Sequence, residues 1–150
     1  MRTHNSWQRK ILTIKRRARL SLPDFIQRYD PETKGPIEFV PADAIQWLLP
    51  AQEYNYVVAR QIREHLFSNG VLDQCYGYRE LLAIQNEGPE FFQKLADGKT
   101  LVGWRGCVES SPGHISVPFL CLICSHIEID WLWIEETLDK NSPALMHRGL

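Results

Sequence analysis

The segment from His126 to Trp133 constrains the fold more than any other part of this chain. Four large apolar residues alternate there with other residues: Ile127, Ile129, Trp131 and Trp133 alternate with His126, Glu128, Asp130 and Leu132. A period of two places one set of side chains on a buried face of a β-strand and the other set on a wetter face. The pattern therefore predicts a half-buried strand in an antiparallel sheet.

The residues around this strand predict the remaining elements. Residues 100–109 read as a strand, Ser110–Gly113 as a turn and 114–124 as the returning strand. Upstream, residues 52–68 favour a helix that stops at Asn69-Gly70, and residues 89–96 favour a second helix with Pro near its start. We expect an α+β fold in which N-terminal helices pack on a C-terminal antiparallel β-sheet of about three to four strands.

A length of 150 residues suits one domain. We divide residues 1–150 into a basic N-terminal arm, a mainly helical part, an antiparallel sheet part and a loose tail, which span 1–20, 21–98, 99–140 and 141–150. Within the arm, residues 7–20 fit two patterns. A helix places Trp7, Ile11 and Ile14 on one face, and a strand alternates apolar with basic residues; good helix formers favour the helix.

Charge is distributed unevenly along the chain. Residues 1–19 hold seven Lys or Arg and no acid, whereas the remainder holds ten basic and eighteen acidic residues. The net charge of −1 thus combines an arm of +7 with a body of −8. Such asymmetry suggests an anionic partner for the arm.

Six arm residues are candidates for binding an anion or partner: Arg9, Lys10, Lys15, Arg16, Arg17 and Arg19. One hypothesis is nucleic acid bound through residues 1–19, with phosphates on the cations and a base on Trp7. A second is a protein partner. A third is docking of the arm on its own acidic body or on that of a twin subunit, which the charge count slightly favours. A homodimer joined through the apolar strands is also expected.

The cysteines suggest one metal hypothesis. Cys121, Cys124 and His126 have the residue types and part of the spacing of a zinc site. A fourth ligand and a second paired motif are missing, and residues three apart on a strand point to opposite faces. We therefore expect buried thiols and no metal or other cofactor.

One strand face suggests a catalytic hypothesis. His126, Glu128 and Asp130 lie two residues apart, so a carboxylate beside the imidazole would raise its pKa for acid–base work. The alternative is an ordinary solvent-facing strand. Trp104, Trp131 and Trp133 form a further set, which would line an apolar pocket or interface or belong to the core.

Known catalytic signatures are missing from the sequence. It contains no phosphate-binding loop, dinucleotide fingerprint, zinc-protease helix motif or nucleophile elbow. We expect a non-enzymatic binding protein whose arm meets an acidic surface of a protein or nucleic acid. The alternative is a small-molecule-binding domain or small enzyme with an aromatic pocket between a curved sheet and helices. No signal peptide or membrane span is recognisable, so we expect a cytoplasmic location.

Overall fold

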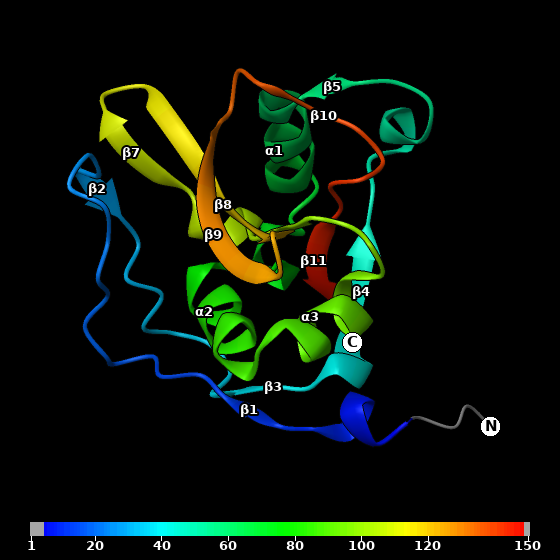
Figure 1. Cartoon of the computed structure of the whole chain (residues 1–150). Coiled ribbons are helices and arrows are strands. Elements are labelled where there is room, and N and C mark those ends of the chain that lie inside the picture. The colour runs from blue at the N-terminus through cyan, green and yellow to red at the C-terminus, as the bar shows by residue number, and fades with distance from the viewer. Residues whose placement is uncertain (1–4, 149–150) are drawn as a thin grey trace.

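The computed structural model of the chain describes residues 5–148 (Figure 1). Residues 1–4, which include Arg2 of the predicted arm, and residues 149–150 of the predicted tail lie outside the described residues. The described part contains three α-helices, α1 (Ala59–Ser68), α2 (Tyr78–Glu87) and α3 (Pro89–Ala96). Its short 3-10 helices are η1 (Ser6–Arg9), η2 (Pro41–Asp43), η3 (Pro50–Glu53), η4 (Leu72–Gln74) and η5 (Trp104–Gly106).

Short strands occur along the whole described chain. They are β1 (Leu12–Thr13), β2 (Arg28–Tyr29), β3 (Glu38–Phe39), β4 (Ala44–Trp47), β5 (Val57–Val58), β6 (Leu101–Val102), β7 (Val108–Ser111), β8 (His114–Ile123), β9 (His126–Trp133), β10 (Thr137–Leu138) and β11 (Ala144–His147). Seven of them form one curled mixed sheet in the order β2-β7-β8-β6-β11-β4, with β9 paired to β8. Two further pairs, β1 with β3 and β5 with β10, are antiparallel.

The predicted arrangement of N-terminal helices on a small C-terminal sheet is wrong. The chain is α+β, but β2 and β4 precede all three helices and belong to the same sheet as β6–β9 and β11. β2 and β4, the strands at the two ends of this sheet order, therefore both come from the N-terminal part of the chain. Short apolar runs such as residues 44–47 carry too little periodicity to identify them as strands without their partners.

The last strand occupies an interior position in the sheet. β11 pairs antiparallel with β4, where Leu145 is opposite Gln46, and parallel with β6, where Ala144 is opposite Val102. The sequence placed these residues in a loose tail, but Leu145 is fully buried. The apolar run at 144–146 is ordered because strands on both sides complete its hydrogen bonds and helices cover it.

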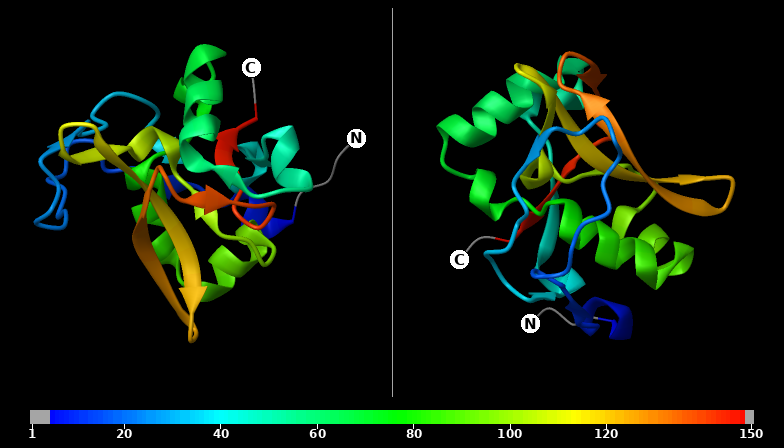
Figure 2. Two further views of the ribbon diagram at one scale, coloured as in Figure 1. Left: turned by 90° about the horizontal axis from the view of Figure 1, so that it is seen from above. Right: turned by 90° about the vertical axis from the view of Figure 1, so that its left-hand side faces the viewer.

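The long β8–β9 hairpin separates two hydrophobic clusters. Residues paired directly across the hairpin share a face, so Leu120 and Ile129 lie on one side and Val117 and Leu132 on the other. The first face packs against α2 and α3, and the second belongs to the cluster around α1. The distal end of the hairpin projects from the body (Figure 2).

The alternation in β9 changes sides along its length. Ile127 and Ile129 are half-buried as the pattern predicts, but Leu132 is 9% exposed and Trp133 is 42% exposed. At this end of the hairpin, the strand face that carries Leu132 packs into the hydrophobic cluster around α1. Trp133 instead stacks on His114, with 5.1 Å between ring centroids.

The arm is neither a long helix nor a long strand. After η1, residues Leu12 and Thr13 pair with Phe39 and Glu38, and the chain then runs irregularly along the body to β2 (Figure 1). Leu12 and Ile14 are buried in the α2–α3 cluster. In the part of the chain that is described, no helix has the length and apolar character needed to cross a membrane.

Candidate functional site

A buried ion pair joins the arm to α2. Nη2 of Arg16 lies 2.6 Å from Oε2 of Glu80, and the side chains are only 6% and 2% exposed. Nε of Arg16 also donates to the carbonyl of Pro36 over 2.9 Å, which orients the guanidinium. Burial raises the pKa of Glu80, while the Gly77 N–H and Arg16 act in the opposite direction. Either partner alone would be an uncompensated buried charge, so the pair fixes the arm to the helix.

A second carboxylate caps the start of α2. Oε2 of Glu32 accepts the backbone N–H of Tyr78 over 3.1 Å, and Oε1 accepts that of Arg79 over 3.5 Å. The first N–H groups of a helix have no partner within it, so this carboxylate satisfies donors that would otherwise be buried and unpaired. Burial, followed by the nearby Glu80, raises the pKa of Glu32 to about 7.

Glycine allows the capping carboxylate to approach. A Cβ on Gly77 would lie 2.2 Å from Oε1 of Glu32. A Cβ on Gly106, which follows β6, would lie 2.8 Å from the backbone nitrogen of Tyr78. The α2 start is therefore packed between the 30–36 loop and η5 with no room for side chains at these two positions.

Arg79 holds the arm from the helix side. Its Nε donates to the carbonyl of Pro31 over 2.6 Å, and its Nη1 donates to those of Lys15 and Ala18 over 2.5 and 2.8 Å. The side chain is 6% exposed. No acid among residues 5–148 lies within 4.0 Å of its guanidinium. Backbone carbonyls thus take the place that a carboxylate usually has beside a buried cation.

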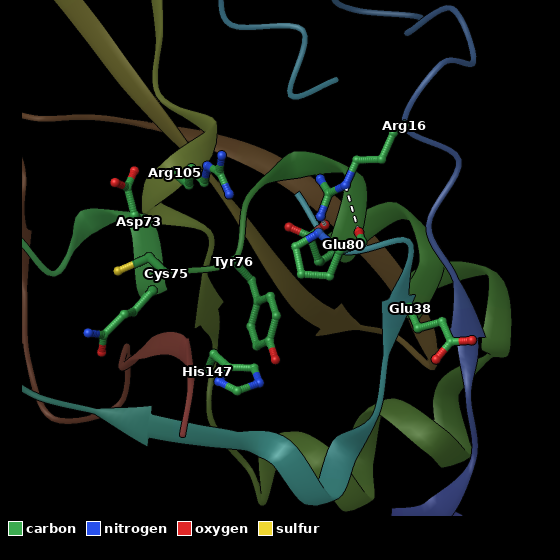
Figure 3. A pocket seen from close by; sticks show the side chains of 10 residues that line it. Arg16, Glu38, Asp73, Cys75, Tyr76, Glu80, Arg105 and His147 are labelled. Atoms are coloured by element: carbon green, nitrogen blue, oxygen red, sulfur yellow. Dashed lines mark hydrogen bonds and ion pairs between the residues drawn. The ribbon is translucent and has the colours of Figure 1, made fainter. Parts of the chain in front are cut away.

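Two cavities flank this junction of arm and α2. The first, which we call the mixed-charge cavity, has a volume of about 230 Å³. Its acidic, basic and histidine lining residues are Arg16, Glu38, Asp73, Glu80, Arg105 and His147, and Cys75 and Tyr76 also line it. Figure 3 shows the Arg16–Glu80 pair on one wall and the Tyr76 ring beside His147 on another.

The mixed-charge cavity contains no activated nucleophile. Cys75 lines it, but burial raises the pKa of this thiol to about 12, so the thiol stays protonated near neutral pH. Burial likewise raises the pKa of Tyr76. The arrangement suits a ligand with both charge signs better than nucleophilic chemistry.

The second cavity, which we call the basic cavity, lies between the arm and the outer side of α2. It has a volume of about 280 Å³ and is lined by Lys15, Arg19 and Arg79, with hydroxyl or amide groups from Thr13, Ser21 and Asn86. Ala18, Leu20, Leu82 and Ala83 complete the lining. Three residues of the lining are basic and none is acidic, so this cavity has the chemistry of an anion site.

The six predicted arm cations therefore have different environments. Arg16 points inward to Glu80, and Lys10 pairs with Glu87 over 2.5 Å. Lys15 and Arg19 line the basic cavity, and Arg9 and Arg17 are exposed. Within residues 5–148, no acid lies within 4.0 Å of these last four. Trp7 packs edge-on against Phe91, with ring centroids 6.2 Å apart.

The other candidates from the sequence lie away from both cavities. His126, Glu128 and Asp130 are exposed on one face of β9, and Asp130 Oδ1 accepts the N–H of Trp131. Cys121 is half-buried on β8, while Cys124 is exposed in the hairpin turn. Over residues 5–148, no three His, Cys, Asp or Glu side chains are grouped so that they could hold a metal ion.

The three tryptophans do not share a pocket. Trp104 is buried in the α1 cluster, and Trp133 is partly exposed beside His114. Trp131 stacks on Tyr78, with centroids 5.3 Å apart, and meets Phe25 edge-on. Neither the mixed-charge cavity nor the basic cavity is lined by any of them.

Sequence reasoning missed Glu32, Arg79, Glu80 and Arg105. One signal was available, because Glu80 stands three residues after Gly77, and Glu at that position often accepts the N-cap N–H. Its Oε1 does so here over 2.8 Å. Nothing in the local sequence around Glu32 indicates that it caps a helix 46 residues later.

No protein-family model, curated protein sequence or solved structure matches this chain.

Proposed function

We propose that this chain is a non-enzymatic binding protein whose arm meets an acidic surface of a protein partner. The observation that carries the proposal is the contrast between the two sides of the arm. Arg16 is committed to the body through its ion pair, and Leu12 and Ile14 are buried. Arg9, Lys15, Arg17 and Arg19 have no acid within 4.0 Å in the described chain.

A fixed arm binds better than a free one. The carbonyls of Lys15 and Ala18 are held by Arg79, so the backbone that carries the cations is already ordered. Ordering a flexible chain on binding would cost conformational entropy, and a preorganised surface avoids much of that cost. The four cations can thus act together on one acidic surface.

The surroundings of the arm favour protein over nucleic acid. Trp7, the aromatic side chain that would stack on a base, is half-buried against Phe91. Stacking on exposed aromatic rings supplies much of the affinity of proteins for single strands. With that ring engaged, the arm offers charge without a stacking platform.

Binding of polyglutamate and of a single-stranded oligonucleotide, measured by fluorescence anisotropy over a range of salt concentrations, tests the proposal. We expect polyglutamate to bind with a marked salt dependence. Replacing Arg9, Lys15, Arg17 and Arg19 by Gln should abolish binding. A control variant removes four cations elsewhere, with Lys94, Lys99, Lys140 and Arg148 replaced by Gln, and should still bind.

Two outcomes would overturn the proposal. Equal loss of binding in the arm variant and the control variant would mean that only net charge matters. Tighter binding of the oligonucleotide than of polyglutamate would favour the nucleic-acid hypothesis instead.

A further inference from the structure

We propose that the basic cavity binds a small organic phosphate, meaning a phosphate monoester with a compact apolar group. This goes beyond the surface binding proposed above, because the ligand is a small molecule held in a cavity.

Arg79 is a buried cation without a counter-ion. It is 6% exposed, and the described residues place no carboxylate within 4.0 Å of its guanidinium. Its contact with Glu32 is through the backbone N–H. A buried charge is costly unless it is paired, so the environment of Arg79 favours an incoming anion.

The guanidinium also has donors to spare. Of its five N–H groups, the one on Nε and the two on Nη1 are used by the carbonyls of Pro31, Lys15 and Ala18. The two on Nη2 have no hydrogen-bond partner within residues 5–148. Three fixed bonds hold the group in place, so Nη2 is preorganised as a donor in a residue that lines the cavity.

The remaining lining fits a phosphate group. Lys15 and Arg19 add two positive charges, and Thr13, Ser21 and Asn86 add neutral donors. A phosphate monoester carries about −1.5 to −2 charges at neutral pH and has three strong acceptor oxygens. A dianion therefore matches three cations better than a carboxylate with its single charge.

The apolar part of the lining indicates what the phosphate group should be attached to. Ala18, Leu20, Leu82 and Ala83 offer contact to a hydrocarbon group, which inorganic phosphate lacks. The volume of about 280 Å³ limits that group to roughly one ring or a short chain, because pockets for drug-sized ligands span about 300–1,000 Å³.

Phenyl phosphate is the probe, and isothermal titration calorimetry on residues 1–150 is the measurement. We expect saturable binding of one equivalent. The affinity should be at least about tenfold higher than for inorganic phosphate, which lacks the apolar group, or for benzoate, which lacks the phosphate dianion. Lys15→Gln and Arg19→Gln should each weaken binding about tenfold. Lys140→Gln, which removes an exposed cation outside the arm and outside the lining, is the control and should leave the affinity unchanged.

A cavity-filling variant separates this site from the surface proposed above. Ala83→Leu fills the basic cavity from α2 without changing any charge, so it should abolish phenyl phosphate binding while polyglutamate still binds. Ala51→Leu, at an exposed position in η3, is its control. Absence of saturable binding, equal affinity for inorganic and phenyl phosphate, or unchanged affinity in Ala83→Leu would each overturn the inference.

Discussion

The carboxylate of Glu32 lies against the first turn of α2, where it accepts the backbone N–H of Tyr78 over 3.1 Å. Glu32, in the 30–36 loop, has a positive φ of 53°, which is the left-handed backbone region. The N-cap residue of α2 is Gly77, which has no side chain to accept these donors. A loop residue from before β3 therefore performs the capping that the helix cannot perform locally.

Stability should fall as pH rises through the range in which Glu32 titrates. Burial raises the pKa of Glu32 from 4.5 to about 7, so between these values the folded chain holds a proton that the unfolded chain releases. The stabilisation of the folded chain by this bound proton is complete below pH 4.5 and is lost as pH rises through 7. It amounts to at most about 3 kcal/mol in the free energy of unfolding. Urea unfolding of Glu32→Gln should show a flatter dependence between pH 5 and pH 8 than that of the unmodified chain. An unchanged slope would contradict this assignment.

Removing one partner of the buried ion pair should be more harmful than removing both charges. Arg16→Met leaves Glu80 buried without its cation, and we expect a loss of about 3–5 kcal/mol in the free energy of unfolding. Adding Glu80→Gln to that variant removes the unpaired charge while the amide oxygen still accepts the Gly77 N–H, so part of the loss should be recovered. A double-mutant cycle by urea unfolding measures the coupling, and strictly additive losses would show that the pair does not act as a unit.

Gly77→Ala should destabilise the chain through a clash and not through backbone strain. The added Cβ would meet Glu32 Oε1 at 2.2 Å, and we expect more than about 2 kcal/mol of destabilisation as the cap is displaced. Gly113→Ala is the matched comparison, since Gly113 has a φ of +79° but open space around it. That variant should lose only about 1–2 kcal/mol. Thermal unfolding of both proteins gives the ranking, and the reverse order would contradict the packing described here.

The thiols of Cys124, Cys107 and Cys75 should react at clearly different rates. Cys124 is exposed in the hairpin turn, whereas Cys75 is 2% exposed and burial raises its pKa to about 12. Burial also raises the pKa of Cys107 to about 11, and its Sγ contacts the Trp104 carbonyl. With a disulfide reagent at pH 8, Cys124 should be modified first, and Cys75 only after unfolding. The fast phase should disappear in Cys124→Ser; a fast phase that persists there would place the reactive thiol elsewhere.

Local signals in the sequence predicted those elements whose partners lie nearby. The helix at residues 89–96 has Pro at its start, and the hairpin strands β8 and β9 are adjacent in sequence and paired across a short turn. The helix expected from residue 52 begins only at Ala59, because Val57 and Val58 pair with Leu138 and Thr137. That pairing spans about half of the chain and leaves no mark on the local pattern.

The candidate site was predictable only in part. The cations of the arm were identified from composition, and Lys15 and Arg19 line the basic cavity. The inward turn of Arg16 depends on Glu80, which is far away in the sequence and belongs to a helix that the sequence left ambiguous. From the sequence alone, Arg79 looks like an ordinary helix-surface cation, but in the fold two carbonyls of the arm and the carbonyl of Pro31 accept hydrogen bonds from it.

The interior position of β11 has a consequence for biosynthesis. β4 and β6 are joined in the sheet only through the strand at residues 144–147. While these residues are still inside the ribosome, β4 and β6 of the emerged chain have no strand between them. The position that Leu145 fills in the hydrophobic core is then empty. The sheet can therefore close between β4 and β6 only after this segment has been translated.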